Sequence, residues 1–393
     1  MICLRRIIVV ISILVFLLGI NAISAKEIIV DLDGAGDFIS INDAINAANG
    51  GDSILIKNGE YSVDTITISK PLTIEGESMA GVILSSEHPS GLFNIKAETQ
   101  LKKMTLISTV SNAIEVASND VFMEYITHSP EGYSTISTDP NQVINNLIIN
   151  HCMFYKGLEI QGAKNMLIKN TDFIGSWGLE LKAITSDIES CEFSGGKVIM
   201  DSSCNDVVFK KCVFEDYDHS CFSMNGNSNK VYNCLFQNIT GLLSSALILQ
   251  GENNEIKGCT FQYNDEGIYV VNGTDSEIKY NNFLENIICG VNGESGYIND
   301  NGYWVGMNVD DNWWGHATGP YHESLNPGGE GDNISGYVEL NSWMNSISTW
   351  TEGSGSGQIN NNDDNTEVVT PGFGLLLLIL TFCIALLVLS QKR

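Results

Sequence analysis

The chain has 393 residues and a formal net charge of −27, because 47 acidic side chains outnumber 20 lysines and arginines. This length suits one large solenoid or two ordinary domains. A surface this acidic repels nucleic acid and anionic lipid, so nucleic acid is excluded as a partner, and it suits a cell exterior or a salty medium.

The N-terminus has the pattern of a secretory signal peptide. Arg5 and Arg6 precede an apolar run over residues 7–20, and small residues follow up to Ala25. We therefore expect residues 1–25 to be a signal peptide and the rest of the chain to be exported. No arginine lies between Arg6 and Arg393.

Residues 26–100 predict an N-terminal cap followed by the first coils of a repeat structure. Ser40 is expected to open a helix whose apolar face would cover the end of the stack. Its apolar residues are Ile41, Ala44, Ile45 and Ala48. The acidic segment 31–37 has some features of a calcium loop, but its later positions do not fit that pattern, so we expect a tight turn.

Within residues 101–300, one three-residue phrase occurs seven times, from Cys152-Met-Phe154 to Asn281-Asn-Phe283, with Cys, Thr or Asn first and Phe third. This repeat predicts a solenoid. A second apolar phrase follows most copies, and both alternate with period two over three or four residues, as short strands do. Short strands joined by Gly and Asn turns predict an all-β, right-handed parallel β-helix of about eleven coils. The phenylalanines expected on the inward ladder are Phe154, Phe173, Phe193, Phe214, Phe236, Phe261 and Phe283.

Cysteines share this ladder. Ten cysteines in an exported chain first suggest disulfides, but the repeat predicts a buried apolar column made of Cys152, Cys191, Cys212, Cys234 and Cys259. The sequence does not decide whether cysteines of neighbouring coils form disulfide bonds. Cys152 and Cys191 are two coils apart, a Cα separation of about 9.6 Å, which is beyond the limit for a disulfide. No pair has zinc-ligand spacing.

Residues 301–350 predict a tryptophan-rich C-terminal cap. Within it, Leu340, Trp343, Met344 and Ile347 have helical spacing, so we expect a helix. Calcium is an option at Asp310, Asp311 and Asp332, although surface carboxylates are the simpler interpretation, and no other cofactor is expected.

The C-terminal part predicts a stalk and a membrane segment. Residues 351–369 are rich in Gly, Ser and Asn and cannot bury a core, so a flexible stalk is expected. Residues 374–390 form an uncharged run before Lys392 and Arg393, which favours a short span with a cytoplasmic basic end. The basic residues at both chain ends account for four positive charges, and removing them leaves −31 on the exported part.

The sequence contains glycosylation acceptor sites but no familiar catalytic motif. Acceptor sequons for N-glycosylation begin at Asn238, Asn272 and Asn333. No nucleophile triad, phosphate-binding loop or redox motif is present. The sequence does not exclude a catalytic pair of carboxylates, because a solenoid brings residues that are distant in sequence together across coils. The residues considered for that role are Asp201, Asp216, Asp218 and Asp265.

Three segments resemble known families. Residues 30–77 resemble the N-terminal cap of pectin-lyase-like β-helices, a group that includes pectin methylesterases and NosD-like repeat proteins. Residues 311–343 are similar to the closing module of prokaryotic surface β-helix proteins. Pro371, Gly372 and Phe373, before an apolar run and a basic end, resemble the PGF-CTERM sorting signal of archaea over residues 370–393. This last resemblance implies cleavage by an archaeosortase and transfer to a lipid anchor.

This fold hosts both enzymes and non-enzymes. Of four motifs in polygalacturonase-like hydrolases only Asn170-Thr-Asp172 matches, which we attribute to chance. Related lyases and methylesterases use arginine on acidic substrates, and the exported part has none. We therefore expect a non-catalytic archaeal surface or S-layer glycoprotein that binds glycans, envelope components or other surface proteins. The alternatives are a polysaccharide lyase or glycoside hydrolase and, less favoured, a NosD-like accessory factor.

Overall fold

The computed structural model describes residues 25–132, 135–175, 177–182, 184–273, 275–294, 297–298 and 304–352. The expected signal peptide up to residue 24, the stalk from residue 353 and the sorting signal at Pro371, Gly372 and Phe373 lie outside the described residues. In the described part of the chain, no helix has the length and apolar character needed to cross a membrane. These residues all belong to one compact unit, Met1–Glu352.

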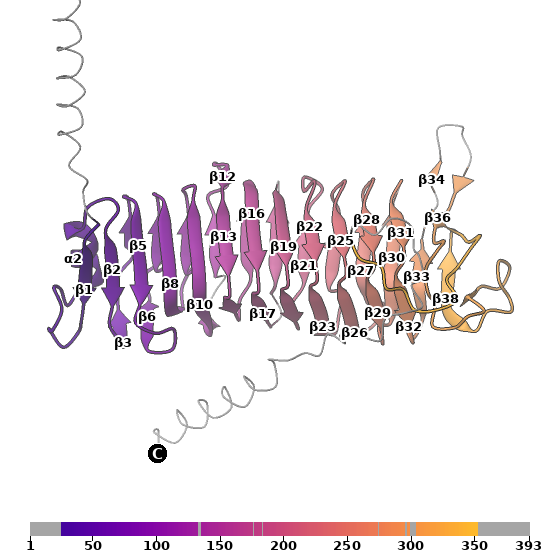
Figure 1. The fold of residues 1–393 in the computed structure, drawn as a ribbon, viewed down its shortest axis with the longest axis horizontal. Coiled ribbons are helices and arrows are strands. Elements are labelled where there is room, and N and C mark those ends of the chain that lie inside the picture. Colours follow the sequence, from indigo (N-terminus) through magenta and orange to yellow (C-terminus); the bar gives the residue numbers. More distant parts are fainter. Residues whose placement is uncertain are drawn as a thin grey trace, which may run out of the picture. The chain divides into compact units, whose positions relative to one another are not determined.

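The body is an all-β parallel solenoid of about 12 turns with almost no helix (Figure 1). Its strands alternate buried and exposed side chains, so each short apolar phrase presents one face to a continuous core. One sheet of 22 strands makes two faces of the rod, and a second sheet of 13 strands makes the third. The expected fold class is confirmed, with one more turn than the sequence suggested.

Face 1 contains the first strand of each coil. Its members are β1 (Glu27–Val30), β2 (Ser53–Ile56), β5 (Leu72–Gly76), β12 (Ile144–Asn145), β13 (Leu147–Asn150), β16 (Ala163–Lys169), β19 (Thr185–Glu189), β22 (Val208–Lys210), β25 (Lys230–Tyr232), β28 (Glu255–Lys257) and β31 (Glu277–Lys279). Two long strands, β8 (Thr99–Ser108) and β10 (Val121–Gly132), bend from face 1 onto face 2.

Face 2 carries the repeated phrase. It consists of β3 (Gly59–Ser62), β6 (Val82–Ser86), β14 (Met153–Phe154), β17 (Asp172–Ile174), β20 (Glu192–Ser194), β23 (Val213–Tyr217), β26 (Leu235–Ile239), β29 (Thr260–Gln262) and β32 (Asn282–Leu284). The phenylalanines pair in register from coil to coil, as in Phe173 with Phe193 and Phe193 with Phe214. Residues at equivalent positions of the phrase are therefore direct neighbours.

Face 3 closes each coil. Its strands are β4 (Ile66–Ile68), β7 (Phe93–Ile95), β9 (Ile114–Val116), β11 (Ile136–Thr138), β15 (Leu158–Gln161), β18 (Leu179–Lys182), β21 (Val198–Met200), β24 (Phe222–Met224), β27 (Ser245–Gln250), β30 (Glu266–Asn272), β33 (Cys289–Gly293), β37 (Pro320–Tyr321) and β38 (Gly331–Gly336). Two small pairs complete the described strands, β34 (Tyr297–Ile298) with β35 (Trp304–Val305) and β36 (Met307–Asn308) with β39 (Val338–Glu339).

From β8 onward, the corner between faces 1 and 2 contains one residue in the left-handed conformation in each coil. Non-glycine residues accept this conformation only at a cost, and asparagine accepts it most readily. The series runs through Asn170 (φ 49°), Ser190 (φ 55°), Lys211 (φ 54°), Asn233 (φ 52°), Gly258 (φ 67°) and Tyr280 (φ 61°). Asparagine fills this position in two of these six coils and glycine in one, and the left-handed residue makes the bend that brings the next strand onto face 2.

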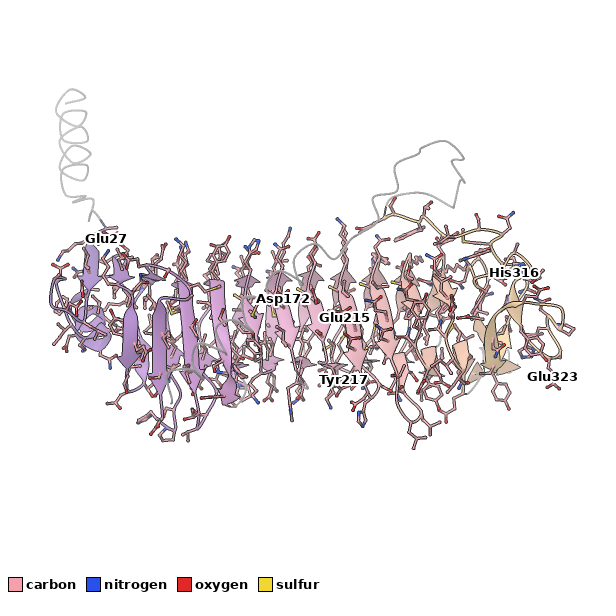
Figure 2. The ribbon with its side chains drawn as sticks, turned by 90° about the horizontal axis from the view of Figure 1, so that it is seen from below. Glu27, Asp172, Glu215, Tyr217, His316 and Glu323 are labelled. Atoms are coloured by element: carbon pink, nitrogen blue, oxygen red, sulfur yellow. The ribbon has the colours of Figure 1, made fainter. Side chains whose placement is uncertain are left out.

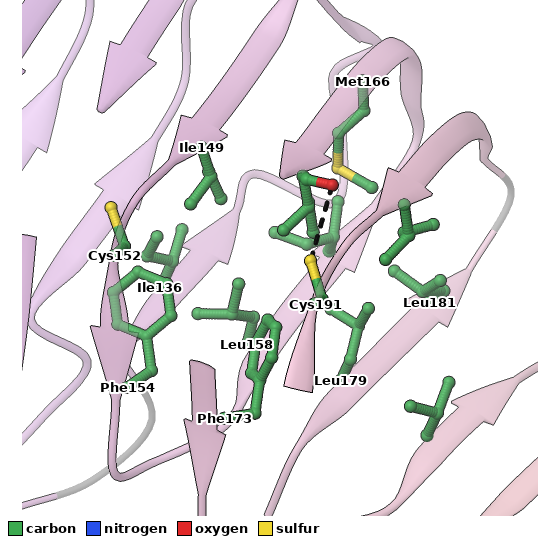
Figure 3. Packing of buried hydrophobic residues seen from close by; sticks show 14 of the residues in the cluster. Ile136, Ile149, Cys152, Phe154, Leu158, Met166, Phe173, Leu179, Leu181 and Cys191 are labelled. Atoms are coloured by element: carbon green, nitrogen blue, oxygen red, sulfur yellow. Dashed lines mark hydrogen bonds between the residues drawn. The ribbon is translucent and has the colours of Figure 1, made fainter. Parts of the chain in front are cut away.

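The core is a stack of aromatic rings with thiols beside it. From Phe173 to Phe283, neighbouring rings of the ladder lie 4.5–5.2 Å apart in near-parallel planes, and the buried ring of Trp314 extends the stack beyond Phe283. Figure 3 shows Cys191 next to this packing, with its Sγ donating to the Ile168 carbonyl oxygen at 3.6 Å. All eight described cysteines are buried free thiols, and burial raises the pKa of Cys152 to about 12.

The N-terminal end contains the one described helix, α2 (Ile41–Ala47). The Ser40 hydroxyl accepts a hydrogen bond from the Asp43 backbone N–H, and the helix buries the face that the sequence predicted. Segment 31–37 is a turn in which Asp37 accepts the Ile29 N–H.

The C-terminal helix predicted at Leu340, Trp343, Met344 and Ile347 is wrong, because residues 340–352 contain no helix. These residues form an irregular segment, here called the strap, which returns along the corner between faces 1 and 2 (Figure 1). Its backbone hydrogen bonds go to the body: Asp310 accepts the N–H groups of Asn341 and Ser342, and Asn282 accepts that of Ser348. Helical spacing was misleading because these partners lie outside the segment.

Candidate functional site

A tryptophan stands exposed at the corner between faces 2 and 3. Trp177 follows β17 and precedes β18, and 63% of its surface is accessible. Gly157 in the preceding coil leaves space for it, since a Cβ at this glycine would approach the Trp177 Cβ to 3.1 Å. The two coils are therefore closely stacked where the Trp177 side chain leaves the backbone.

Charged side chains surround this indole and form a shallow depression of about 60 Å³. We call the group the Trp177 shelf; it comprises Trp177, Glu159, Glu180, Lys182, Lys197 and Ile199. The Lys197 Nζ lies 6.0 Å from the centre of the Trp177 ring, within cation–π range. Lys182 pairs with Glu180 at 2.7 Å and with Glu159 at 3.4 Å.

The chemistry of the shelf suits a sugar ring. An indole offers an apolar face, and a pyranose has an apolar C–H face that can lie against it. The flanking carboxylates and ammonium groups can exchange hydrogen bonds with ring hydroxyls. Two carboxylates and two ammonium groups leave the shelf without net charge, in contrast to the acidic molecule as a whole.

A row of carboxylates lies on face 2, near the middle of the rod (Figure 2). Asp172 pairs in register with Glu192 of the next coil, and Glu215 follows one coil later, opposite Ser194. We call these three residues the carboxylate row. It begins five residues before Trp177 in the chain, so β17 connects the row to the shelf.

Protonation distinguishes the members of the carboxylate row. Burial, followed by the negative charges of Asp172 and Glu215, raises the pKa of Glu192 to about 7. Burial also raises the pKa of Asp172 above its usual value. The Glu215 carboxylate accepts a hydrogen bond from the Gln237 side chain at 2.7 Å. The row can therefore hold a proton on Glu192 near neutral pH, as a general acid must.

The carboxylates considered from sequence do not converge. Asp201 accepts from Ser203, Asp216 within β23 accepts from Asn238, Asp218 just after β23 is paired with His219, and Asp265 accepts from Gly241 and Ser244. Their hydrogen bonds go to separate partners, and only Asp216 and Asp218 share a coil.

The residues considered for calcium have protein partners. Asp310 binds the strap, Asp311 accepts the Ser342 hydroxyl, and Asp332 accepts from Asn286. Among the described residues, no group of three or more His, Cys, Asp or Glu side chains is arranged to hold a metal ion. The sequon residues Asn238, Asn272 and Asn333 are all exposed.

A larger open cavity of about 390 Å³ lies at the C-terminal end. Tyr263, Glu285, Glu330 and Asp332 contribute to its wall. The Asp332 carboxylate is already bonded to Asn286, at 3.0 Å from its backbone nitrogen and 2.6 Å from its side chain. We assign no ligand to this cavity.

Sequence reasoning missed both the shelf and the carboxylate row. A signal for the row was present, because Asp172 and Glu192 are the middle residues of consecutive copies of the phrase. Once the phenylalanines are aligned, these two acids must be neighbours. For Trp177 the sequence contains no comparable signal beyond its place in a predicted turn, next to Gly178.

Comparisons with known proteins agree with this fold. Residues 187–313 match the family model described as a right handed beta helix region. No curated protein matches the sequence. Among solved structures, the A-module of mannuronan C-5 epimerase AlgE6 from Azotobacter vinelandii has a TM-score of 0.52 at 14% identity, covering 79% of this chain and 90% of that one.

Two further solved structures are similar at lower scores. The periplasmic alginate epimerase AlgG has a TM-score of 0.48 at 14% identity, covering 75% of this chain and 77% of that one. A family 28 exopolygalacturonase from Yersinia enterocolitica has a TM-score of 0.49 at 11% identity, covering 67% and 76%. At such identities the similarity concerns the fold, and by fold this chain is a right-handed parallel β-helix of the pectin-lyase-like type.

Proposed function

We propose that the protein is a non-catalytic glycan-binding β-helix of the cell surface, attached to the membrane through its C-terminal segment. The observation that supports this best is the Trp177 shelf, where an indole with 63% of its surface accessible stands beside paired charges. Large apolar side chains that a fold holds in the open are typical of binding sites. The expected signal peptide and sorting signal support the location.

The charge distribution favours a neutral glycan. The exported part carries −31 by sequence and contains no arginine, so it repels an acidic polymer and lacks the bidentate donor that carboxylates prefer. The shelf itself is electrically balanced. A neutral sugar chain lying across Trp177 would avoid the repulsion and use both the ring and the flanking charges.

A glycan array probed with the purified protein tests this proposal. Trp177→Ala should weaken binding to every bound glycan at least tenfold, because a central aromatic contact carries much of the energy of such a site. The matched control is Tyr321→Ala, which removes another partly exposed aromatic side chain away from the shelf. Unchanged binding by the Trp177 variant would reject the shelf as the glycan site.

The carboxylate row favours a second candidate, a polysaccharide-active enzyme that uses Glu192 as proton donor. A carboxyl group that can hold a proton near neutral pH, beside further carboxylates, is the kind of residue set that glycoside hydrolysis uses. Release of reducing sugar is measured on the same glycans. If the candidate is right, Glu192→Gln abolishes release while binding through Trp177 persists, and Glu189→Gln on face 1 leaves release unchanged. Absence of release by the wild-type protein would reject it.

A further inference from the structure

Lysines gather on face 1, although the molecule as a whole is acidic. Nine lysines lie within the described strands, and seven of them are on face 1, whereas Lys182 is on face 3 and Lys103 is at the bend of β8. Seven acidic side chains in the same face 1 strands balance their charge. Face 1 is therefore the side of the rod on which a second acidic molecule meets the least repulsion.

One outward column of face 1 has charges of opposite sign on the two sides of its midpoint. Its residues pair in register on seven successive coils and are all partly exposed: Glu75, Lys102, Glu124, Asn150, Lys169, Glu189 and Lys210. We call these seven residues the charge ladder. Asn150 is its midpoint, and at one, two and three coils from Asn150 the residues on the two sides carry opposite charges. Such a column is complementary to a reversed copy of itself.

A second outward column supplies an apolar centre. Phe122, Ile148 and Leu167 follow one another in register on three coils, and each is half-buried. Ile148 and Asn150 both belong to β13, so the apolar column and the charge ladder have the same midpoint. The Lys102 Nζ lies 5.3 Å from the centre of the Phe122 ring. An apolar centre between charged ends is the arrangement of protein–protein interfaces.

We propose that face 1 is a pairing surface for a second copy of the chain, with the two rods antiparallel. A two-fold axis along β13 reverses the direction of the rod and keeps the direction of the strands, so each column faces its own copy. Ile148 then meets Ile148 of the second copy, and Phe122 meets Leu167. The charge ladder places opposite charges together throughout: Glu75 with Lys210, Lys102 with Glu189, and Glu124 with Lys169.

The strap limits the size of this surface. Beyond Lys210 the next residue of the column is Tyr232, on which Trp350 packs, so the free part of the column ends there. Seven coils span about 29 Å and a strand about 13 Å, which gives roughly 400 Å² for each copy. A standard interface buries about 800 Å² on each partner, so we expect a weak and reversible pair.

Pairing through face 1 is compatible with glycan binding and does not depend on it. In a coil of three faces, the corner between faces 2 and 3 lies opposite face 1. Trp177 is on that corner, so the Trp177 shelf stays open in both copies. A pair would therefore present two shelves, and a polymeric glycan could engage both with a gain in avidity.

Sedimentation velocity of the full-length chain in a mild detergent tests the pairing. We expect a monomer–dimer equilibrium between about 1 and about 200 µM protein, the range in which a weak pair dissociates. Ile148→Asp puts two carboxylates at the centre and should weaken the pair at least about tenfold. The matched control is Ile248→Asp on β27 of face 3, another partly exposed isoleucine, and it should leave the equilibrium unchanged. Circular dichroism checks that both variants keep the β-helix.

Exchange of charges tests the antiparallel register. Glu124→Lys and Lys169→Glu each place like charges opposite one another, so each variant alone should pair at least about tenfold more weakly than the wild type. An equimolar mixture of the two variants restores every opposite pair, and we expect a mixed dimer of wild-type affinity. A wild-type protein that stays monomeric, or dimers that Ile148→Asp does not weaken, would overturn the proposal. A mixture that pairs no better than its two components would overturn it as well.

Discussion

His128 is a polar residue in a position that the neighbouring coils fill with apolar side chains. It pairs in register with Leu106 on one side and Phe154 on the other, and it is fully buried. The Thr135 hydroxyl lies 2.9 Å from its Nδ1, whereas no described residue offers a partner to its Nε2. Burial, with a smaller contribution from Lys156, lowers the pKa of His128 to about 4.

This histidine should make the fold sensitive to mild acid. With a pKa of about 4 when folded and the ordinary 6.5 when unfolded, it takes up a proton on unfolding between these values. Its contribution is therefore complete above pH 6.5 and declines as the pH falls towards 4, by about 3 kcal/mol in total. Denaturant unfolding of the wild type and of His128→Leu across this range measures the effect.

The His128→Leu variant should lose this part of the pH dependence. The exposed His219 is the matched control, so His219→Leu should retain the wild-type profile. An identical slope of stability against pH in the wild type and the His128 variant would contradict the assignment.

At the scale of elements, the strap depends on one carboxylate. Asp310 accepts the backbone N–H groups of Asn341 and Ser342, and its side chain also contacts those of Asn308 and Asn341. Burial alone would raise the pKa of Asp310, but these hydrogen bonds outweigh it and hold the pKa below its usual value. The strap therefore begins at a strong anchor.

Removing this anchor should release the strap without unfolding the rod. Asp310→Ala removes the acceptor of two exposed backbone N–H groups, which water can replace, so we expect a cost of about 1 kcal/mol. We expect limited proteolysis within residues 341–352 to become faster while the circular dichroism of the β-helix is retained. Asp33→Ala, in a turn at the other end, is the control and should leave cleavage unchanged. Equal cleavage rates in both variants would count against the role of Asp310.

The fold could be predicted because the same local sequence pattern recurs from coil to coil. Each copy of the phrase carries its own strand pattern, so Phe173, Phe193 and Phe214 indicate both the element and its neighbour. The strap could not be predicted in this way. Its hydrogen bonds go to Asp310 and Asn282, far away in sequence, so its apolar spacing did not reflect a helix.

The candidate site could be predicted from the sequence only in part. Asp172 and Glu192 share one position of the phrase, and aligning the copies would have paired them. The raised pKa of Glu192 needed the structure, because it depends on burial and on Glu215. Trp177 lies in a turn of variable length, where the repeat carries no information about exposure.

At the scale of the whole molecule, acidic charge is poorly compensated. Seven of the described lysines pair with acids on the surface, as Lys57 does with Glu77 at 2.8 Å and Lys169 with Glu189 at 3.5 Å. Exposed pairs of this kind contribute little to stability. The excess of 27 negative charges over the full chain therefore repels itself at low ionic strength.

Salt should stabilise the folded protein. Raising sodium chloride from about 0.05 M to about 1 M shortens the screening length to roughly 3 Å and weakens repulsion between surface carboxylates. We expect the thermal unfolding midpoint to rise over this range. The triple variant Asp33→Asn, Asp64→Asn and Asp218→Asn should show a smaller rise, because it starts with less repulsion. A midpoint that falls with salt would show that the surface ion pairs dominate.

The course of the strap also determines how the molecule bears a mechanical load. A pull on the C-terminal end enters the body at Glu352 and Trp350, on the flank, before it reaches β38. The contacts of the strap then open one after another, in a peeling geometry, while the hydrogen-bonded coils remain unloaded. Residues 340–352 would act as a sacrificial segment that lengthens under tension and protects the coils that carry Trp177 and Glu192.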